Sequence, residues 1–385
     1  MNVRNFLRST NDLGEMERIG RQIWDANPET YNDRRQALLS KMLDEEMPNA
    51  SREEKDRMLY ISIYDYWMYG VNLKEEFSLH FTELSHEEKQ EYITFRNRFL
   101  YTYYLNDEKY ALNLLEDKYN AYLKFQGHYL RDVICIESEK DFEGFKAFVK
   151  KHQTFVVKPI SLGFGWGVHK QTVSESDDLH EVFLGILSEG DAIQKKHHIK
   201  THTTRFVLEE LIPQSDKLGR LHPDSVNCVR LSTIVVDDKV HFFYPRIKVG
   251  RHGNFISNAG DDGFLVGINT ETGLIETNAA DEYGNVFERH PDTNIRFIGF
   301  PIPDWDGLLQ LGRKIALELA PRIRYVGWDM AYTDEGWCIL EGNPEGEFGA
   351  QFIYKRGLKK ELESILGWKP DLAYWWEDPV ATKIQ

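Results

Sequence analysis

Three oxygen-bearing side chains near the end of the chain have the types and spacing of a ligand set for one divalent cation. Asp329, Glu341 and Asn343 lie on two short strand-like runs joined by a turn-forming segment that ends in glycine. If Thr333 pairs with Trp337, Asp329 lies opposite Glu341, and Asn343 follows on the same face because side chains alternate along a strand. Two carboxylates and an amide suit Mg²⁺, with Mn²⁺ as the alternative ion, and a bound Mg²⁺ commonly also contacts phosphates. A solvated acidic hairpin is the competing interpretation.

A lysine followed by alternating glycines forms a second group with chemical meaning. Lys158 ends the strand-like run 154–157 and precedes Gly163, Gly165 and Gly167. Such glycines let backbone N–H groups approach phosphate oxygens closely, and the lysine would add positive charge. The pattern matches neither a P-loop, nor a dinucleotide fingerprint, nor a protein kinase. A flexible hairpin tip with a solvent-directed lysine is the alternative.

Paired glutamates mark a candidate base-binding segment. Glu209 and Glu210 lie in the apolar run 204–211, which breaks at Pro213. A flat adenine ring could form hydrogen bonds with the main chain at Glu210 and Ile212 where such a strand ends. An ordinary charged strand edge is the alternative reading of the same residues.

The elements that must position these groups follow from periodicity. From about Asn11 to Tyr122, apolar and aromatic residues recur at helical spacing, which predicts helices with aromatic core faces; a groove lined by these rings is the alternative. Farther along, helical and strand-like runs intermix, and Asp237–Asp238 is expected to form a two-residue hairpin turn. The expected strands are 132–136, 154–157, 204–211, 227–236, 239–248, 326–332 and 337–341, and the expected helices are 139–152, 175–188 and 308–319.

Composition excludes several functional classes. The 385 residues include 41% hydrophobic and 28% charged residues, a globular balance that is large enough for two or three domains. A formal charge of −15 argues against broad binding to a nucleic-acid backbone. No apolar run is long enough to cross a bilayer and no signal-peptide core follows the first residues, so a cytoplasmic protein with no membrane span is expected.

The order of these motifs resembles that of the ATP-grasp superfamily over roughly residues 115–355. The carrying residues are Asp117–Lys118, Val157–Lys158–Pro159, the glycines 163–167, Glu209–Glu210, and Asp329 with Glu341-Gly342-Asn343. The segment 227–233, together with Arg246, Lys248 and Asn258, is similar to the sugar-transfer-associated group within that superfamily.

The resemblance implies a role for each matching residue. Lys118 and Lys158 would hold the ATP phosphates under the glycine loop, and Glu209 would meet the adenine edge. The ribose would bind Asp216, with Gln214 as the alternative. The implied cofactor-binding set is Lys118, Lys158, Ser161, Gly163, Gly165, Gly167, Glu209, Glu210, Ile212 and Asp216; the metal set is Asp329, Glu341 and Asn343; and Arg230, Arg246 and Lys248 would face the γ-phosphate or an acidic substrate, with cross-strand ion pairing as their alternative role.

The implied fold is of the α+β class: an ATP-grasp fold, in which two α/β lobes clamp ATP, preceded by a helical N-terminal domain. The expected domains are residues 1–112 (helical), 113–210 (the lobe with the first lysine, glycine loop and hinge strand) and 211–385 (the lobe with the metal site and a helical tail). Many ATP-grasp enzymes begin with a Rossmann-like substrate domain, and this chain departs from that pattern. The Gly-rich segment 250–263, with Asn258, Asp261 and Asp262, is expected to form a flexible wall of the substrate site or a surface hairpin.

The implied reaction is ATP-dependent carboxylate–amine ligation through an acylphosphate, forming an amide bond with release of ADP and phosphate. The expected partners are ATP and a small-molecule or sugar-linked carboxylate and amine, in polysaccharide modification or secondary metabolite synthesis. We also count a homodimer among the expected assemblies. A small-molecule kinase and a non-catalytic nucleotide-binding interaction module are the alternative functions.

Overall fold

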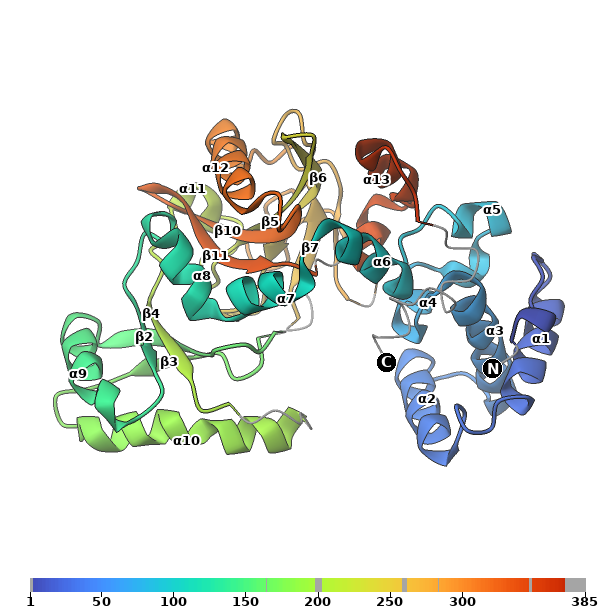
Figure 1. Ribbon diagram of the computed structural model, residues 1–385, viewed down its shortest axis with the longest axis horizontal. Helices are drawn as coiled ribbons and strands as arrows, with labels where there is room; N and C mark the ends of the chain where they lie inside the picture. The colour runs from blue at the N-terminus through green and yellow to red at the C-terminus, as the bar shows by residue number, and fades with distance from the viewer. Residues whose placement is uncertain are drawn as a thin grey trace. The chain divides into compact units, whose positions relative to one another are not determined.

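The chain forms two compact units in a computed structural model that describes residues 3–163, 165–197, 203–257, 262–282, 284–345 and 348–370 (Figure 1). Residues 1–104 and 347–385 make up unit 1, and residues 105–346 make up unit 2. These bounds differ from those of the three expected domains 1–112, 113–210 and 211–385, which stay predictions. The described residues 348–370 thus group with the N-terminal helices.

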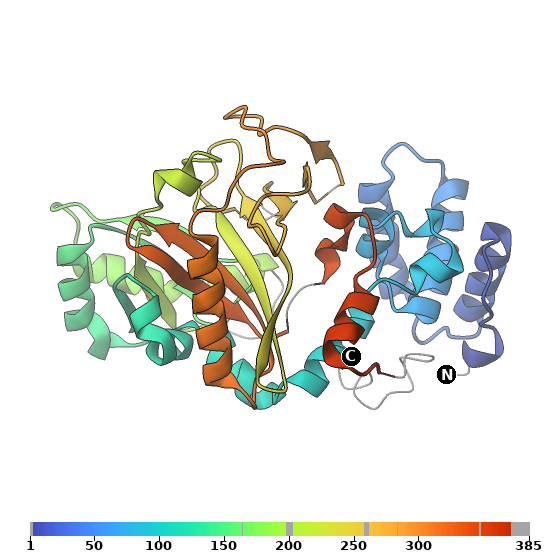
Figure 2. The ribbon, with the colours of Figure 1, turned by 90° about the horizontal axis from the view of Figure 1, so that it is seen from above.

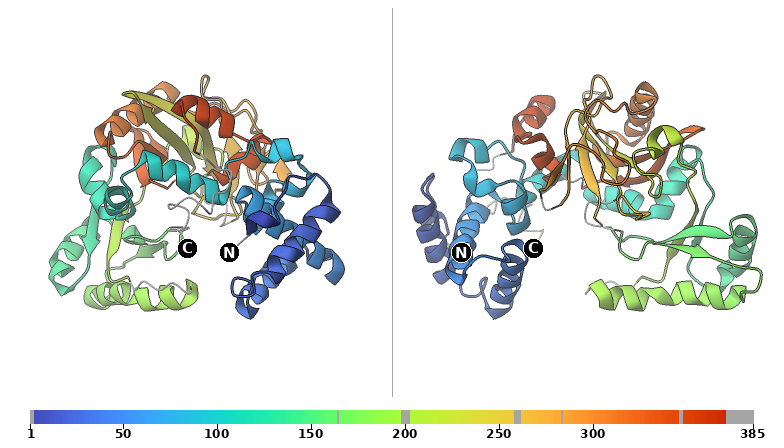
Figure 3. Two further views of the ribbon diagram at one scale, coloured as in Figure 1. Left: turned by 45° about the vertical axis from the view of Figure 1, so that its right-hand side comes forward. Right: turned by 180° about the vertical axis from the view of Figure 1, so that it is seen from behind.

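Unit 1 is helical, as the spacing of its apolar residues predicts. The longest helix, α3, begins at a capping box in which Ser51 and Glu54 satisfy each other's backbone N–H groups. Tyr64 and Trp67 on this helix are buried in the core, whereas Tyr103, in the same stretch that was expected to form aromatic core faces, is exposed. The helices, coloured from blue to teal in Figure 3 except for the red α13, are α1 (Leu13–Asp25), α2 (Asp33–Glu46), α3 (Arg52–Tyr69), α4 (Leu73–Ser78), α5 (His86–Lys89), α6 (Phe95–Leu105) and α13 (Lys359–Leu366). There are 3₁₀ turns at Val3–Asn5, Phe81–Glu83 and Gly349–Tyr354.

Unit 2 contains a four-stranded antiparallel sheet in the order β1-β4-β2-β3. Its strands are β1 (Val133–Ile136), β2 (Thr154–Pro159), β3 (His169–Thr172) and β4 (Phe206–Glu210). Apolar residues of α9 (Phe142–Lys151) and α10 (Leu179–His197) pack with one face of this sheet in a shared core (Figure 1). The opposite face is therefore available for the polar side chains of β2 and β4.

A second, seven-stranded sheet follows the order β11-β10-β5-β6-β7-β8-β9 and is antiparallel throughout. The expected turn at Asp237–Asp238 is confirmed: both residues have positive φ, and Val236 pairs with Lys239. Helix α12 (Trp305–Leu319) packs along the sheet (Figure 2). The strands of this sheet are β5 (Cys228–Val236), β6 (Lys239–Val249), β7 (Phe264–Gly267), β8 (Ala279–Ala280), β9 (Val286–Phe287), β10 (Tyr325–Thr333) and β11 (Gly336–Asn343).

Unit 2 also contains the short helices α7 (Glu108–Ala111), α8 (Lys118–Phe125) and α11 (Asp216–Gly219). A π-helical turn lies at Leu112–Glu116, and 3₁₀ turns lie at Gln126–His128 and Glu139–Asp141.

The hairpin of β10 and β11 has the expected pairing of Asp329 with Glu341, but by a different route. Thr333 pairs with Gly336, not with Trp337, so the turn is one residue tighter than expected. The register then shifts next to Asp329, where an extra residue of β11 is accommodated as a bulge, and Asp329 again faces Glu341. The bulge thus restores the cross-strand pair that the tighter turn would have removed.

Among the described residues, no helix combines the length and the apolarity needed to span a membrane.

Candidate functional site

A lysine–glutamate pair lies on the polar face of the four-stranded sheet. Val156 of β2 pairs with Glu209 of β4, so Lys158 projects from the same face as Glu209. The Lys158 ammonium lies 2.8 Å from Oε2 of Glu209, and both side chains are mostly buried. Burial opposes the charge of Glu209, but Arg131 and Lys158 outweigh it and lower the pKa of Glu209 to about 2. Glu209, which is expected to contact adenine, therefore also neutralises Lys158, which is expected to bind phosphate.

Lys118 lies at the base of the glycine loop. Asp117 caps helix α8 by accepting from the backbone N–H groups of its first turn, which explains an aspartate directly before the lysine. The Lys118 ammonium donates to the carbonyl of Leu162 at 2.8 Å, and its backbone N–H donates to that of Ile160. Burial lowers the pKa of Lys118, while neighbouring Glu341 acts in the opposite direction. Lys118 thus contacts the glycine loop and is also influenced by Glu341 of the β10–β11 hairpin.

The glycine loop joins β2 to β3, with Ser161 exposed at its start. Gly165 and Gly167 both have positive φ, the conformation that glycine adopts without steric cost. The turn is closed by N–H donation from Trp166 to Gly163 and from Val168 to Gly165. These bonds close the loop on either side of Gly165, and the printed lysine contact of the loop is that of Lys118 with the carbonyl of Leu162.

Substitution of the loop glycines should give unequal effects. A Cβ on Gly167 would lie 2.6 Å from Cδ1 of Ile193 and 2.8 Å from Cγ of Pro159, at a φ of +74°, whereas a Cβ on Gly163 would meet nothing within 4 Å. We expect Gly167→Ala to cost about 1–3 kcal/mol of stability and to weaken ATP binding, while Gly163→Ala leaves stability nearly unchanged. Thermal unfolding and titration with a fluorescent ATP analogue measure both quantities. Equal losses in the two variants would contradict this account of the loop.

The base-binding role of the strand end at the paired glutamates stays a prediction, because some of its backbone groups already have partners within the chain. The backbone N–H of Glu210 already donates to the carbonyl of Asp132, and the carbonyl of Ile212 accepts from Gln214. The structure also bears on the ribose alternatives. Both ends of the Gln214 amide are engaged, by Asn227 and Ser225, whereas Asp216 is exposed at the start of α11. This arrangement favours Asp216 as the ribose residue.

A row of charged residues crosses four adjacent strands of the large sheet, and we call it the charge row: Glu341, Asp329, Arg230 and Arg246. Each member pairs with the next across the strands β11, β10, β5 and β6. Arg230 forms a two-pronged ion pair with Asp329, and Lys248 of β6 lies 2.9 Å from Oδ2 of Asp329. The guanidinium of buried Arg246 lies 4.8 Å from the ring centre of Tyr244. Cross-strand ion pairing, the alternative for the basic residues, is thus present at Arg230 and Lys248.

The donor set of the hairpin fits a hard divalent cation. Nδ2 of Asn343 lies 3.4 Å from Oε1 of Glu341, so the two side chains share one face beside Asp329. Burial opposes the charge of Asp329, but Arg230 and Lys248 outweigh it and hold the pKa of that carboxyl far below its usual range. Each carboxylate oxygen has more than one lone pair, so Asp329 could keep these partners and still accept a cation. Glu341 and Asn343 would hold Mg²⁺ with the help of Asp329.

The expected substrate wall is only partly described, because Asn258 and Asp261 lie outside the described residues. Asp262 accepts hydrogen bonds from Arg251, and one of its oxygens lies 2.8 Å from Nδ1 of His252. The role of the segment 250–263 stays a prediction.

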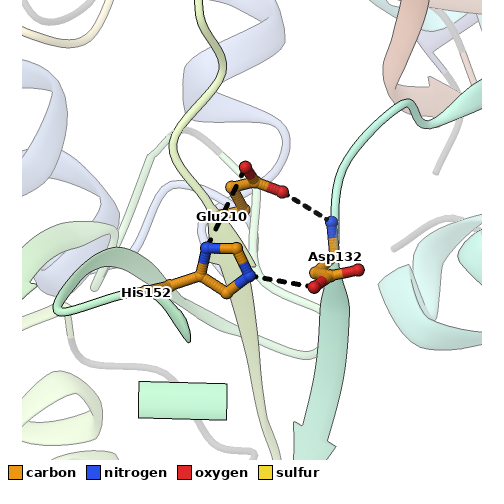
Figure 4. A group of neighbouring side chains, drawn as sticks. All are labelled: Asp132, His152 and Glu210. Carbon is orange, nitrogen blue, oxygen red and sulfur yellow. Dashed lines mark hydrogen bonds and ion pairs between the residues drawn. The ribbon is translucent and has the colours of Figure 1, made fainter. Parts of the chain in front are cut away.

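A second polar cluster lies on the other side of the hinge strand: Asp132, His152 and Glu210 (Figure 4). His152 presents Nε2 to Asp132 at 2.9 Å and Nδ1 to Glu210 at 3.9 Å, while the backbone N–H of Asp132 donates to Glu210. Because opposite ring nitrogens of His152 face the two carboxylates, the geometry suits a separate polar contact with each carboxylate better than one shared metal ion. We interpret the cluster as a polar clasp on β4.

Sequence reasoning missed Arg131, the residue directly before this clasp. Its side chain is fully buried and bonds to Glu209. A lone arginine beside an apolar strand gives no local signal of such a role. Only the pairing of β1 with β4, which sets Val133 opposite Glu209, brings it to the site.

The chain combines two antiparallel sheets: one carries Lys158 and continues into the glycine loop, and the other carries the hairpin with Asp329, Glu341 and Asn343. This is the arrangement expected of an ATP-grasp protein. The sequence profile of the sugar-transfer associated ATP-grasp family matches residues 95–366. This match covers more than half of the chain, so the chain belongs to that family. The sequence-based expectation of this family and fold is confirmed.

The solved structures to which the chain is similar include two ligases and a synthetase. D-alanine–D-alanine ligase from Helicobacter pylori matches at 14% identity and a TM-score of 0.40, over 67% of this chain and 62% of its own. N5-carboxyaminoimidazole synthetase from Staphylococcus aureus, complexed with ADP, matches at 12% identity and a TM-score of 0.39, over 68% of this chain and 54% of its own. The ATP-grasp ligase PsnB, complexed with a minimal precursor, matches at 16% identity and a TM-score of 0.35, over 68% of this chain and 63% of its own. The chain therefore spans less than two thirds of the length of each, and no curated protein matches it.

Proposed function

We propose that this protein is an ATP-dependent carboxylate–amine ligase, as its family membership and site residues suggest. The observation that carries the proposal is the charge row, which aligns Glu341, Asp329, Arg230 and Arg246 across four strands. Burial lowers the pKa of Lys118, and the charge of Glu341, a member of this row, opposes that shift. Cations and metal ligands arranged in this way suit the transfer of a γ-phosphoryl group.

In the proposed reaction, a carboxylate oxygen of the first substrate attacks the γ-phosphorus, and ADP leaves. The resulting acylphosphate is attacked by the amine of the second substrate, an amide bond forms, phosphate leaves, and the nitrogen loses a proton. Lys158 and Lys118 bind phosphate oxygens, while Arg230, Arg246 and Lys248 stabilise the negative charge that develops on the transferred group. Asp329, Glu341 and Asn343 would hold Mg²⁺, which would supply positive charge against that of the phosphates. A reaction that consumes ATP also favours a cytoplasmic location.

A screen for ADP release tests the proposal. Purified full-length protein is incubated with Mg-ATP and pools of small or sugar-linked carboxylic acids and amines, each alone and in pairs. We expect ADP release that requires one acid and one amine, with an amide product detected by mass spectrometry. A phosphorylated product formed without any amine would contradict ligation and indicate a small-molecule kinase. ATP binding with no ADP release under any pair would favour the non-catalytic interaction module.

The acid and amine are proposed to belong to polysaccharide modification or secondary metabolite synthesis, following the family's description as sugar-transfer associated. Sugar acids and amino acids are therefore the first compounds to test. Sugar acids and amino acids can be tested in either order, because the charge row would suit any small acid.

A further inference from the structure

The side chain of Arg131 links three parts of the candidate site. Nε donates to Oε2 of Glu209 at 2.8 Å, and Nη2 lies 2.8 Å from the same oxygen. Nη1 donates to the carbonyl of Ile339 on β11 at 2.7 Å and to that of Tyr129 at 3.0 Å. The guanidinium also lies 4.6 Å from the ring centre of Tyr129. This one fully buried cation therefore connects the hinge strand β4 with the strand that carries Glu341.

The charges around Glu209 show what Arg131 contributes. Lys158 lies 2.8 Å from the same Oε2 atom that Arg131 contacts. With both cations present, one carboxylate faces two positive groups, and the cluster retains one positive charge. Without Arg131, the charge of Glu209 would be balanced by Lys158 alone. A lysine that is fully paired with a buried carboxylate attracts phosphate much less strongly than one that shares it.

We propose that Arg131 is a positioning residue that balances the charge of Glu209 and so leaves the ammonium of Lys158 available to an ATP phosphate. The proposal rests on the proposed function insofar as that function requires ATP. The side-chain hydrogen bonds of Arg131 go to Glu209, Tyr129 and Ile339. Arg131 acts through Glu209, which also pairs with Lys158.

The position of the contact at Ile339 adds a second role to the same side chain. Ile339 precedes Glu341 by two residues on β11, on the side of the bulge toward the turn. The guanidinium therefore fixes the hinge strand and the metal-binding strand against one another at one point. The clasp of Asp132 and His152 holds Glu210, the neighbour of Glu209, from the opposite face.

Arg131→Met tests the proposal, because methionine keeps much of the packing and removes the charge. We expect ATP affinity to fall by about tenfold or more, while binding of adenosine, which has no phosphate, changes little. The probes are fluorescent analogues of ATP and adenosine, titrated into the full-length protein. Arg322→Met is the matched control, because Arg322 also stacks on a tyrosine, Tyr110, and pairs with a carboxylate, Asp107. ATP affinity within about twofold of the wild type in folded Arg131→Met would overturn the proposal.

A second substitution separates charge balance from a merely structural role. Glu209→Gln removes the negative charge that Arg131 balances, so in the Arg131→Met background it should restore ATP affinity by severalfold. An arginine that only packs would show no such rescue, and a double variant as weak as Arg131→Met would overturn the proposal. If Arg131→Met fails to fold, Arg131→Lys decides: it keeps the charge and should keep ATP affinity even at a lower melting temperature, whereas a tenfold loss of affinity in folded Arg131→Lys would overturn the proposal.

The outcomes also separate this proposal from the proposed function. Absence of ATP binding by the wild-type protein would contradict the function itself. Wild-type ATP binding without any change in Arg131→Met would contradict only the role of Arg131.

Discussion

Glu341→Gln should lower ATP-dependent turnover by about a hundredfold or more while leaving the fold intact. Glu341 is only partly buried, and it lies opposite Asp329 beside the amide of Asn343. Glutamine preserves the shape of the side chain and removes its charge, so the substitution weakens the hold on Mg²⁺ without opening a cavity. Part of the lost rate should return at higher Mg²⁺ concentration, because the variant binds the ion more weakly.

The readouts for Glu341→Gln are ADP release and the Mg²⁺ dependence of binding of a fluorescent ATP analogue. The second does not require the natural substrates. The matched control is Glu335→Gln in the exposed turn of the same hairpin, which should behave like the wild type. An unchanged Mg²⁺ dependence in Glu341→Gln would contradict the role of Glu341 in holding the ion.

Asp329 is a less suitable position for this test. Its carboxylate is buried between Arg230 and Lys248, so Asp329→Asn would leave two cations short of a partner and reduce stability as well as activity. A loss of activity in that variant could not be assigned to the metal site alone.

The hairpin shows why a local pattern can predict a pairing and miss its cause. Alternation and turn composition predicted Asp329 opposite Glu341, and the structure has that pair. The turn itself is tighter than expected, and a bulge compensates. A bulge of one residue leaves no clear mark in composition, because its cost depends on the strands packed around it.

The hinge shows a different limit. The sequence predicted that Glu209 and Lys158 belong to one site, but not that they touch. Their contact depends on β4 lying between β1 and β2, a pairing between segments about fifty residues apart. The same order brings Arg131 to Glu209. Sheet order is set by packing of the whole core, so local periodicity predicts the strands but not these partners.

Three buried ionisable groups of the helical unit interact with one another, and the sequence did not single them out: Asp65 of α3, Glu76 of α4 and Lys89 of α5. The ammonium of Lys89 lies 2.8 Å from Asp65, and neither side chain is exposed. Burial raises the pKa of Glu76 well above its ordinary value, the nearby Asp65 raises it further, and Lys89 opposes both. Burial also raises the pKa of Asp65, against the effect of Lys89. The two carboxyls together should therefore retain one proton where exposed carboxyls have lost theirs.

This arrangement predicts how the stability of the helical unit depends on pH. A carboxyl whose pKa is raised by folding stabilises the folded state below its unfolded pKa, and that contribution is lost as pH rises toward the folded value. The stabilising contribution of Glu76 therefore begins to fall near pH 4.5, the ordinary pKa of glutamate, and continues to fall as the pH rises. Glu76→Gln should make the unit's stability less dependent on pH above this value, because the amide releases no proton. Parallel curves for wild type and variant would contradict a retained proton.

Removing both carboxyls should have a far larger effect than removing either. In Asp65→Asn, Glu76 can ionise and become the partner of Lys89, so the loss is limited. In Asp65→Asn with Glu76→Gln, Lys89 is left buried without a counter-charge, among the rings of Tyr69 and Phe81. We expect the double variant to lose about 3–5 kcal/mol, more than the sum of the single variants. Hydrogen exchange of the backbone amides of α3 measures the stability of this unit within the full chain. Additive losses would show that Glu76 does not replace Asp65, because the coupling arises only if one carboxyl can take over the ion pair of the other.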